Sequence, residues 1–207
     1  MLDMHITCHT LAHTAQRSGS VAMQVDPVMS QRMATWVVWA VTNSHRKMDE
    51  FASAQAGKQW LQRAEPPPDN SEVTVTVLGG LGGMGLPASA ALSMLGYSVV
   101  TCSRSMKNVG KASAIEKAKH ITFEQLDELL PTTDVLVCLL PLTDSTRGII
   151  SSPLLQKLKR GAAVVNAGRG AHVVEDHLLA ALDSGTSVSV CRSHFLHTQS
   201  QLLKLDG

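Results

Sequence analysis

Residues 73–85, VTVTVLGGLGGMG, place a short β-branched run directly before a glycine-rich loop. Alternating valine and threonine favour a strand, and the apolar residues 83–95 that follow the run indicate a helix. Between them, Gly80, Gly82 and Gly85 form the pattern G-x-G-x-x-G. In this context the pattern predicts a dinucleotide-binding loop, because its backbone can approach a pyrophosphate and the helix N-terminus attracts the anion. The predicted cofactor-binding residues of this loop are Gly80, Leu81, Gly82, Gly83, Met84 and Gly85.

Outward from this loop, short apolar runs alternate with helical patterns. The runs at 73–78, 98–102, 134–140 and 162–166 are predicted strands, and helices are expected at 83–95, 123–130, 153–158 and 174–182. This alternation predicts an α/β fold, a Rossmann-type doubly wound parallel sheet with helices on both faces. We assign residues 67–193 to this NAD(P)-binding domain, which would be incomplete at its C-terminal side.

The chain before the sheet has a different texture. Asp26-Pro27 predicts a helix start, since aspartate is a good N-cap and proline suits the first helical position. A Met- and Trp-containing stripe on this helix is expected to pack in the core or at a subunit contact; it comprises Met29, Met33, Trp36, Val37, Ala40 and Val41. The prolines at 66–68 then end any regular element. Residues 21–66 thus form a helical segment and linker, while 1–20, expected to be poorly ordered, and 194–207 match nothing.

The second predicted strand ends at Ser103, Arg104 and Ser105. An NAD-binding protein would place an acidic residue here to bind the ribose hydroxyls. An arginine between two hydroxyls suits a 2′-phosphate instead, so we expect NADP(H) to be preferred over NAD(H).

The next two strands end in turns that should line the same crevice, since ligands bind at the carboxyl ends of parallel strands. Arg169 lies between two glycines and can bind a substrate carboxylate with its planar guanidinium. The cofactor-binding residues predicted in these turns are Leu140, Pro141, Leu142, Thr146, Ala167, Gly168 and Arg169.

Composition excludes several classes of protein. A formal net charge of +1 and 3% aromatic residues argue against nucleic-acid binding, and no apolar run approaches the ~20 residues of a membrane span. Without a clear targeting signal, the cytoplasm is the default location. The scattered cysteines are expected to be buried, reduced thiols. No metal site is predicted, because no second cluster completes the N-terminal stripe of His5, Cys8, His9 and His13.

The motifs LGGLGGMG, CSRS, CLLPLTDSTRGII and NAGRGAHVVEDHLLAALDSG together resemble the D-isomer-specific 2-hydroxyacid dehydrogenase family, in particular its glyoxylate/hydroxypyruvate reductase branch. The resemblance covers residues 21 to 185. It implies hydride transfer from NADPH to a 2-oxo acid such as glyoxylate or hydroxypyruvate, with Arg169 as the catalytic arginine. It also implies a homodimer, with residues 21–66 as a remnant of the substrate domain.

The resemblance fades after Gly185, before the family's glutamate and its catalytic histidine. Gln199, near the glutamate position, cannot hold a negative charge. His172 is a poor substitute for the acid, because the following helix N-terminus disfavours an imidazolium. We therefore expect this chain to be weak or inactive as an enzyme. A non-catalytic dinucleotide-binding or redox-sensing module remains the alternative.

Overall fold

The computed structural model describes residues 26–63, 65–104, 115, 118–184 and 187–192, and a parallel sheet of six strands is its centre. The strand order is β3-β2-β1-β4-β5-β6, the order of a dinucleotide-binding Rossmann sheet. The strands are β1 Thr74–Leu78, β2 Ser98–Ser103, β3 Lys119–Thr122, β4 Val135–Cys138, β5 Ala162–Asn166 and β6 Ser187–Arg192.

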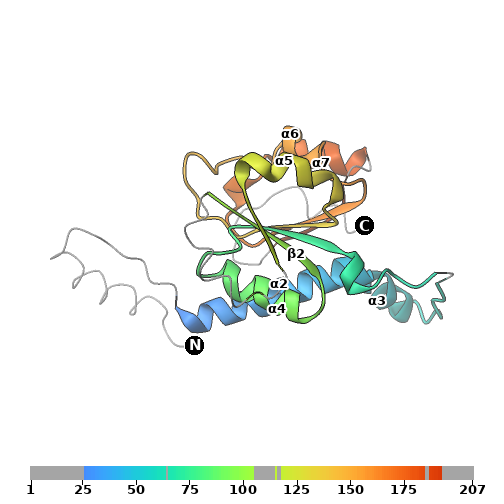
Figure 1. Ribbon diagram of the computed structural model, residues 1–207. Coiled ribbons are helices and arrows are strands. Elements are labelled where there is room, and N and C mark those ends of the chain that lie inside the picture. Colours follow the sequence, from blue (N-terminus) through green and yellow to red (C-terminus); the bar gives the residue numbers. More distant parts are fainter. Residues whose placement is uncertain (1–25, 64, 105–114, 116–117, 185–186, 193–207) are drawn as a thin grey trace, which may run out of the picture.

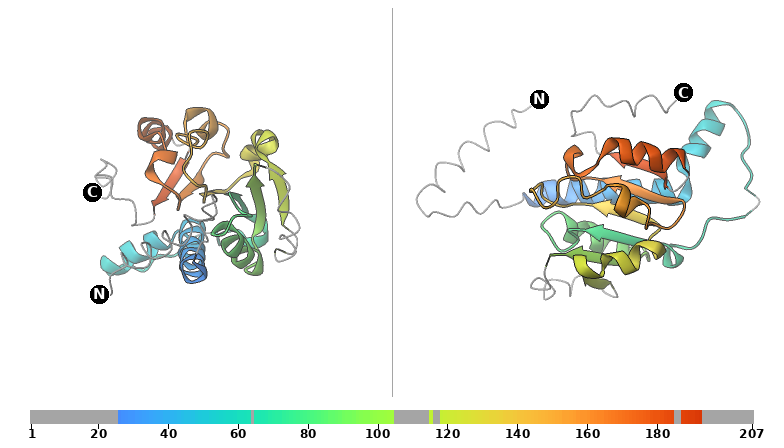
Figure 2. Two further views of the ribbon diagram at one scale, coloured as in Figure 1. Left: turned by 90° about the vertical axis from the view of Figure 1, so that its left-hand side faces the viewer. Right: turned by 90° about the horizontal axis from the view of Figure 1, so that it is seen from above.

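Helices cover both faces of the sheet (Figure 1). One face is covered by α2 (Pro27–Arg46) and α4 (Gly85–Met94), which pack against each other. The end-on view shows α5 (Leu126–Leu129), α6 (Ser152–Leu155) and α7 (Glu175–Asp183) on the other face (Figure 2). A short helix, α3 (Met48–Ala56), continues from α2 away from the sheet. Among the described helices, none is long and apolar enough to cross a membrane.

Strand side chains pack on both sides because helices cover both sides. In β1, Val75 and Val77 are fully buried in the core beneath α2 and α4, whereas Leu78 packs in the core of the opposite face. Strands β4 and β5 are buried at every position. The near-continuous apolar runs in the sequence reflect this two-sided burial.

Helix α2 begins as its sequence predicts. The Asp26 carboxylate accepts a hydrogen bond from the Val28 amide at 2.9 Å, and Pro27 is the first helical residue. Val37, Ala40 and Val41 are fully buried in the same core as β1. The predicted apolar stripe is therefore an inner layer of the sheet domain. A division of the chain at residue 66 stays a prediction.

The predicted strands and helices are present with shifted ends, and two strands were missed. Strand β4 ends at Cys138 rather than at 140, and the segment expected as helix 123–130 is divided into the 3-10 helix η3 (Phe123–Gln125), α5 and η4 (Leu130–Thr132). Strand β3 escaped prediction because it is four residues long. Strand β6 was missed because its run, SVSVCR, contains few large apolar residues.

Candidate cofactor and substrate site

The glycine loop joins β1 to α4 at the carboxyl edge of the sheet. Gly79 adopts φ +81°, so the left-handed turn lies one residue before the first glycine of the pattern. The Gly82 amide donates to the Gly79 carbonyl at 2.9 Å, which closes the turn. Helix α4 then begins without a side-chain cap and without an acidic residue in its first turn. The Leu86 amide donates to the Gly82 carbonyl at 2.9 Å and Pro87 has no N–H, so a phosphate would meet the partial positive charge of the helix start and the loop amides that precede Leu86.

The three glycines of the pattern differ in how much space surrounds them. A Cβ on Gly80 would lie 2.7 Å from the Thr101 side chain of β2, and one on Gly85 would lie 2.1 Å from the Gly79 carbonyl oxygen. A Cβ on Gly82 would meet the Gly79 oxygen alone, at 3.1 Å. Gly80 and Gly85 therefore allow internal packing, whereas Gly82 keeps the loop surface open to a ligand.

A pocket of about 550 Å³ lies beside this loop. Seven predicted cofactor-binding residues line it: Leu81, Gly82, Ser103, Arg104, Leu140, Pro141 and Thr146. Because β1, β2 and β4 are neighbours in the sheet, parallel topology brings these segments to one edge, as the sequence predicts.

The other predicted site residues lie around this pocket rather than in its lining. Gly80 and Gly85 are buried within the loop, and Gly83 and Met84 lie at the start of α4. Leu142 is exposed in the turn after β4, whereas Ala167 and Gly168 are buried after β5. Ser105 lies outside the described residues. The remaining predicted residue, Arg169, is described below.

Five further residues line the pocket and were not predicted: Gly79, Phe123, Leu139, Ser145 and Ile149. Phe123 follows β3 directly, and the run KHIT contains only one apolar residue, so no local pattern placed it there. Ile149 lies far along the turn after β4 and shows no local pattern. Together they make the pocket apolar enough to hold a planar ring.

Thr146 shapes the turn after β4. Its buried hydroxyl donates to the Pro141 carbonyl at 2.7 Å and accepts from the Thr143 amide at 2.8 Å. These bonds hold residues 141–146 as a compact turn. Thr146 therefore contributes to the pocket through the shape of the turn as well as by lining it.

Arg104 lies at the end of the pocket nearest β2. It is exposed and makes no ion pair with another described residue. With Ser103 beside it, this cation is accessible to an anionic group in the pocket. The place matches the position at which the ribose of a dinucleotide is recognised.

Arg169 follows β5 at the same edge of the sheet. Its side chain is exposed and is held by one contact, from Nη1 to the Gly168 carbonyl at 3.3 Å. No carboxylate in the described part of the chain neutralises it. An unpaired guanidinium at this edge can bind a carboxylate through two parallel hydrogen bonds.

His172 is fully buried, and its Nδ1 accepts a hydrogen bond from the Arg169 amide at 2.9 Å. Burial lowers the pKa of this imidazole, and the Arg169 charge lowers it further. A buried neutral ring whose Nδ1 is engaged cannot serve as the proton donor to a substrate, in agreement with the sequence.

Two cysteine thiols lie in the sheet near this site. Burial raises the pKa of Cys102 to about 12 and that of Cys138 to about 11. Such thiols are almost entirely protonated at neutral pH, so they are poor redox sensors. They match the predicted buried, reduced state.

No group of three potential metal ligands gathers among the described residues. The predicted N-terminal stripe that includes His5 and Cys8 lies outside them.

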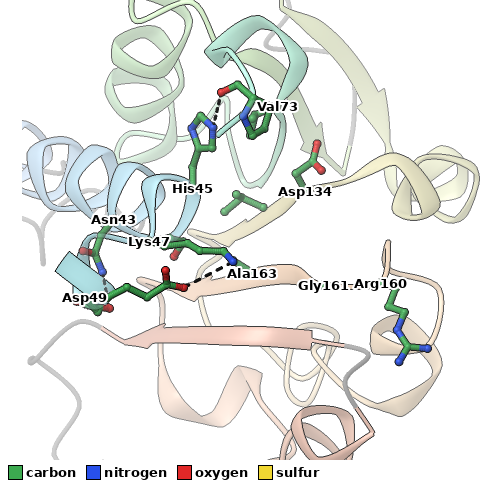
Figure 3. A pocket seen from close by; sticks show the side chains of 13 residues that line it. Asn43, His45, Lys47, Asp49, Val73, Asp134, Arg160, Gly161 and Ala163 are labelled. Carbon is green, nitrogen blue, oxygen red and sulfur yellow. Dashed lines mark hydrogen bonds and ion pairs between the residues drawn. The ribbon is translucent and has the colours of Figure 1, made fainter. Parts of the chain in front are cut away.

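A second pocket, of about 360 Å³, lies at the opposite, amino edge of the sheet (Figure 3). Its polar side chains bind one another: Asn43 donates to Asp49 at 2.9 Å, and His45 Nε2 contacts the Pro68 carbonyl at 2.8 Å. Arg160 points away from these groups. Because Asn43, Asp49 and His45 are paired internally, this pocket offers less to a ligand than the carboxyl edge.

Residues 38–199 match the family described as the NAD-binding domain of the D-isomer specific 2-hydroxyacid dehydrogenases. This match extends beyond residue 185, where the resemblance was expected to end. The glyoxylate/hydroxypyruvate reductase A of Citrobacter koseri is 36% identical over 159 residues, which are 77% of this chain and 48% of the relative. That of Serratia proteamaculans is 33% identical over 160 residues, 77% of this chain and 49% of the relative. The chain thus spans about half the length of the curated relatives it matches.

Solved structures of 2-hydroxyacid dehydrogenases are similar to this chain as well. A probable 2-hydroxyacid dehydrogenase from Rhizobium etli, in complex with NADP, HEPES and L(+)-tartaric acid, superposes with a TM-score of 0.74 at 32% identity, covering 90% of this chain and 61% of that chain. An NADPH-dependent glyoxylate/hydroxypyruvate reductase from Sinorhizobium meliloti, in complex with NADP and sulfate, superposes with a TM-score of 0.73 at 32% identity. The superposition covers 87% of this chain and 57% of that chain.

Proposed function

The chain belongs to the D-isomer specific 2-hydroxyacid dehydrogenase family, and from this premise we propose that it binds NADP(H) together with a 2-oxo acid such as glyoxylate or hydroxypyruvate and reduces that acid weakly or not at all, because none of the described residues is placed to donate the proton. One observation carries the proposal: Arg169, exposed and without a carboxylate partner among the described residues, follows β5 at the same edge of the sheet as the uncapped start of α4. A cation for the substrate and a cradle for the cofactor phosphates would then lie at the same edge of the sheet.

The residues present fit a dinucleotide. The open surface at Gly82 and the partial positive charge at the start of α4 suit its pyrophosphate. The apolar part of the pocket, with Phe123 and Ile149, suits a flat ring. When bound, the cofactor supplies the hydride.

Arg169 would bind the substrate carboxylate and polarise the adjacent carbonyl, since both oxygens can accept from a planar guanidinium. Because it is exposed and held only by the Gly168 carbonyl, its side chain can turn toward a substrate without breaking an internal ion pair. Fixing the carboxylate orients the carbonyl carbon for hydride transfer.

Arg104→Asp is expected to reverse the cofactor preference. The unchanged chain should bind NADPH at least about tenfold more tightly than NADH, because the guanidinium can pair with the 2′-phosphate. An aspartate would repel that phosphate and accept hydrogen bonds from the free ribose hydroxyls. Titration of both cofactors by intrinsic fluorescence would measure the ratio.

Arg147→Asp is the matched control, because Arg147 is also an exposed arginine but does not line the pocket. It should leave the ratio unchanged. Equal affinity of the unchanged chain for both cofactors would refute the assignment of Arg104.

We also propose a homodimer through the end of α2, helix α3 and the segment that follows it. Large apolar side chains are exposed there: Trp39 (54%), Met48 (49%), Phe51 (40%), Trp60 (92%) and Leu61 (36%). Large exposed apolar side chains concentrated in one segment of the chain are typical of a protein interface. Arg63 fixes the segment by stacking 4.6 Å from the Phe51 ring centre and pairing with Glu50 at 3.0 Å.

Trp60→Ser should therefore weaken dimerisation by about tenfold or more, since exposed tryptophans are frequent hot spots. Light scattering across a dilution series would measure the dissociation constant. Leu142→Ser, which alters an apolar residue at the opposite edge, is the control. A chain that is monomeric at every concentration would contradict the proposal.

A further inference from the structure

The backbone of Arg169 is held by more hydrogen bonds than its side chain. Its amide donates to His172 Nδ1 at 2.9 Å. Its carbonyl accepts from the Asn166 side-chain amide at 2.9 Å and from the His172 backbone amide at 3.0 Å. Asn166 Oδ1 also accepts from the Gly168 amide at 3.1 Å. Two buried side chains thus fix the turn that carries an exposed guanidinium.

The His172 ring also lies close to the turn that follows β4. A Cβ built on Gly168 would lie 2.7 Å from His172 Nδ1 and 3.2 Å from the Leu140 carbonyl oxygen, so the ring, Gly168 and the end of the β4 segment meet at one point. The Pro141 carbonyl raises the pKa of the ring, against the dominant lowering by burial. Nε2 itself has no hydrogen-bond partner among the described residues.

The tautomer follows from these contacts. Because Nδ1 accepts from the Arg169 amide, the proton of the neutral ring lies on Nε2. Nε2 is buried and has no hydrogen-bond partner in the described structure. A buried unpaired donor is costly, so an apolar side chain would suit stability alone better at this nitrogen. The imidazole is explained by what its Nδ1 does for Arg169.

We propose that His172 is a positioning residue: its buried imidazole fixes the backbone of Arg169 and packs against the turn at Leu140 and Pro141, which sets the two turns of the crevice in one arrangement. Backbone bonds continue this link, from the Gly148 amide to the Ala171 carbonyl at 2.8 Å and from the Ile150 amide to the His172 carbonyl at 2.9 Å. An effect of His172 on carboxylate binding by Arg169 rests on the proposed function. The positioning of the Arg169 backbone by His172 does not.

The test is a matched pair of variants. In His172→Asn, the side-chain Oδ1 takes the place of Nδ1 and can still accept from the Arg169 amide; in His172→Leu, of similar size, no acceptor remains. Amide hydrogen exchange of Arg169 should be slow in the unchanged chain and in His172→Asn, and at least about tenfold faster in His172→Leu. Equal protection in a folded His172→Leu variant would overturn the proposal.

A second measurement uses the unchanged protein, so it does not depend on how a variant folds. The ¹⁵N chemical shifts of the His172 ring should show a neutral imidazole protonated at Nε2 near neutral pH. A ring protonated at Nδ1 would contradict the proposal.

Binding of oxalate, used as a dicarboxylate probe, to the NADPH-bound protein should be about tenfold weaker in His172→Leu than in His172→Asn, with similar NADPH affinities. A probe that binds equally to both variants would contradict the coupling of His172 to the substrate site. If oxalate binds none of the three chains, the proposed function fails, and hydrogen exchange still decides the role of His172.

Discussion

Gly85→Ala is expected to abolish NADPH binding and to destabilise the fold by about 2–4 kcal/mol. Its Cβ would lie 2.1 Å from the Gly79 carbonyl oxygen and 2.7 Å from the Gly80 Cα. Both are backbone atoms, so no side-chain rotation relieves the overlap, and α4 must move away from β1. Urea denaturation and a NADPH titration would measure the two effects.

Gly82→Ala is the matched control in the same loop. Its Cβ would meet the Gly79 oxygen at 3.1 Å and otherwise enters open space beside the pocket. We expect stability to change by less than about 1 kcal/mol while NADPH binding weakens, because the methyl group occupies the surface that the pyrophosphate would approach. Equal destabilisation by both alanines would show that the loop does not have the described packing.

Arg169→Ala is expected to weaken oxalate binding to the NADPH-bound protein by about 100-fold, because two charge-assisted hydrogen bonds are lost. NADPH affinity itself should change by less than about threefold, since the residue does not line the cofactor pocket. Any glyoxylate-dependent oxidation of NADPH should disappear with it. Calorimetry for binding and absorbance at the nicotinamide band for turnover would measure these effects.

Two controls accompany this variant. Arg169→Lys keeps the charge but loses the planar fork, so an intermediate loss is expected. Arg147→Ala removes another exposed arginine and should leave oxalate binding unchanged. If Arg147→Ala and Arg169→Ala weaken oxalate equally, the carboxylate binds elsewhere.

The parts of this fold that could be predicted from the sequence are those written in local patterns. A strand buried on both faces has a continuous apolar run in the sequence, and the spacing of its glycines indicates the dinucleotide-binding loop after β1. Arg169 drew attention because it lies between two glycines soon after such a run. Its place at the carboxyl edge of the sheet, beside the glycine loop, then followed because ligands bind at the carboxyl ends of parallel strands.

What could not be predicted depends on contacts between distant segments. Gly79 adopts the left-handed turn and approaches the Leu139 carbonyl of the next strand segment, whereas Gly80 packs against Thr101 of β2; both contacts join segments distant in the sequence. Phe123 reaches the pocket only because β3 pairs with β2. The role of His172 as a hydrogen-bond acceptor for Arg169 needed the folded turn, since the sequence shows a histidine near an arginine and no direction for either side chain.

The binding of NADPH to this 207-residue chain is the measurement that tests the central claim most directly. A calorimetric titration gives the affinity for NADPH. Amide chemical-shift mapping by NMR in a parallel titration identifies the residues at the binding site. We predict saturable binding with one NADPH per chain, and shifts at residues 79–85, at Arg104 and in the turn of Thr146. Absence of binding up to about 1 mM NADPH would contradict the account, because a dissociation constant of that size corresponds to a binding free energy of only about −4 kcal/mol. Shifts confined to the amino-edge pocket of His45 and Arg160 would contradict it equally.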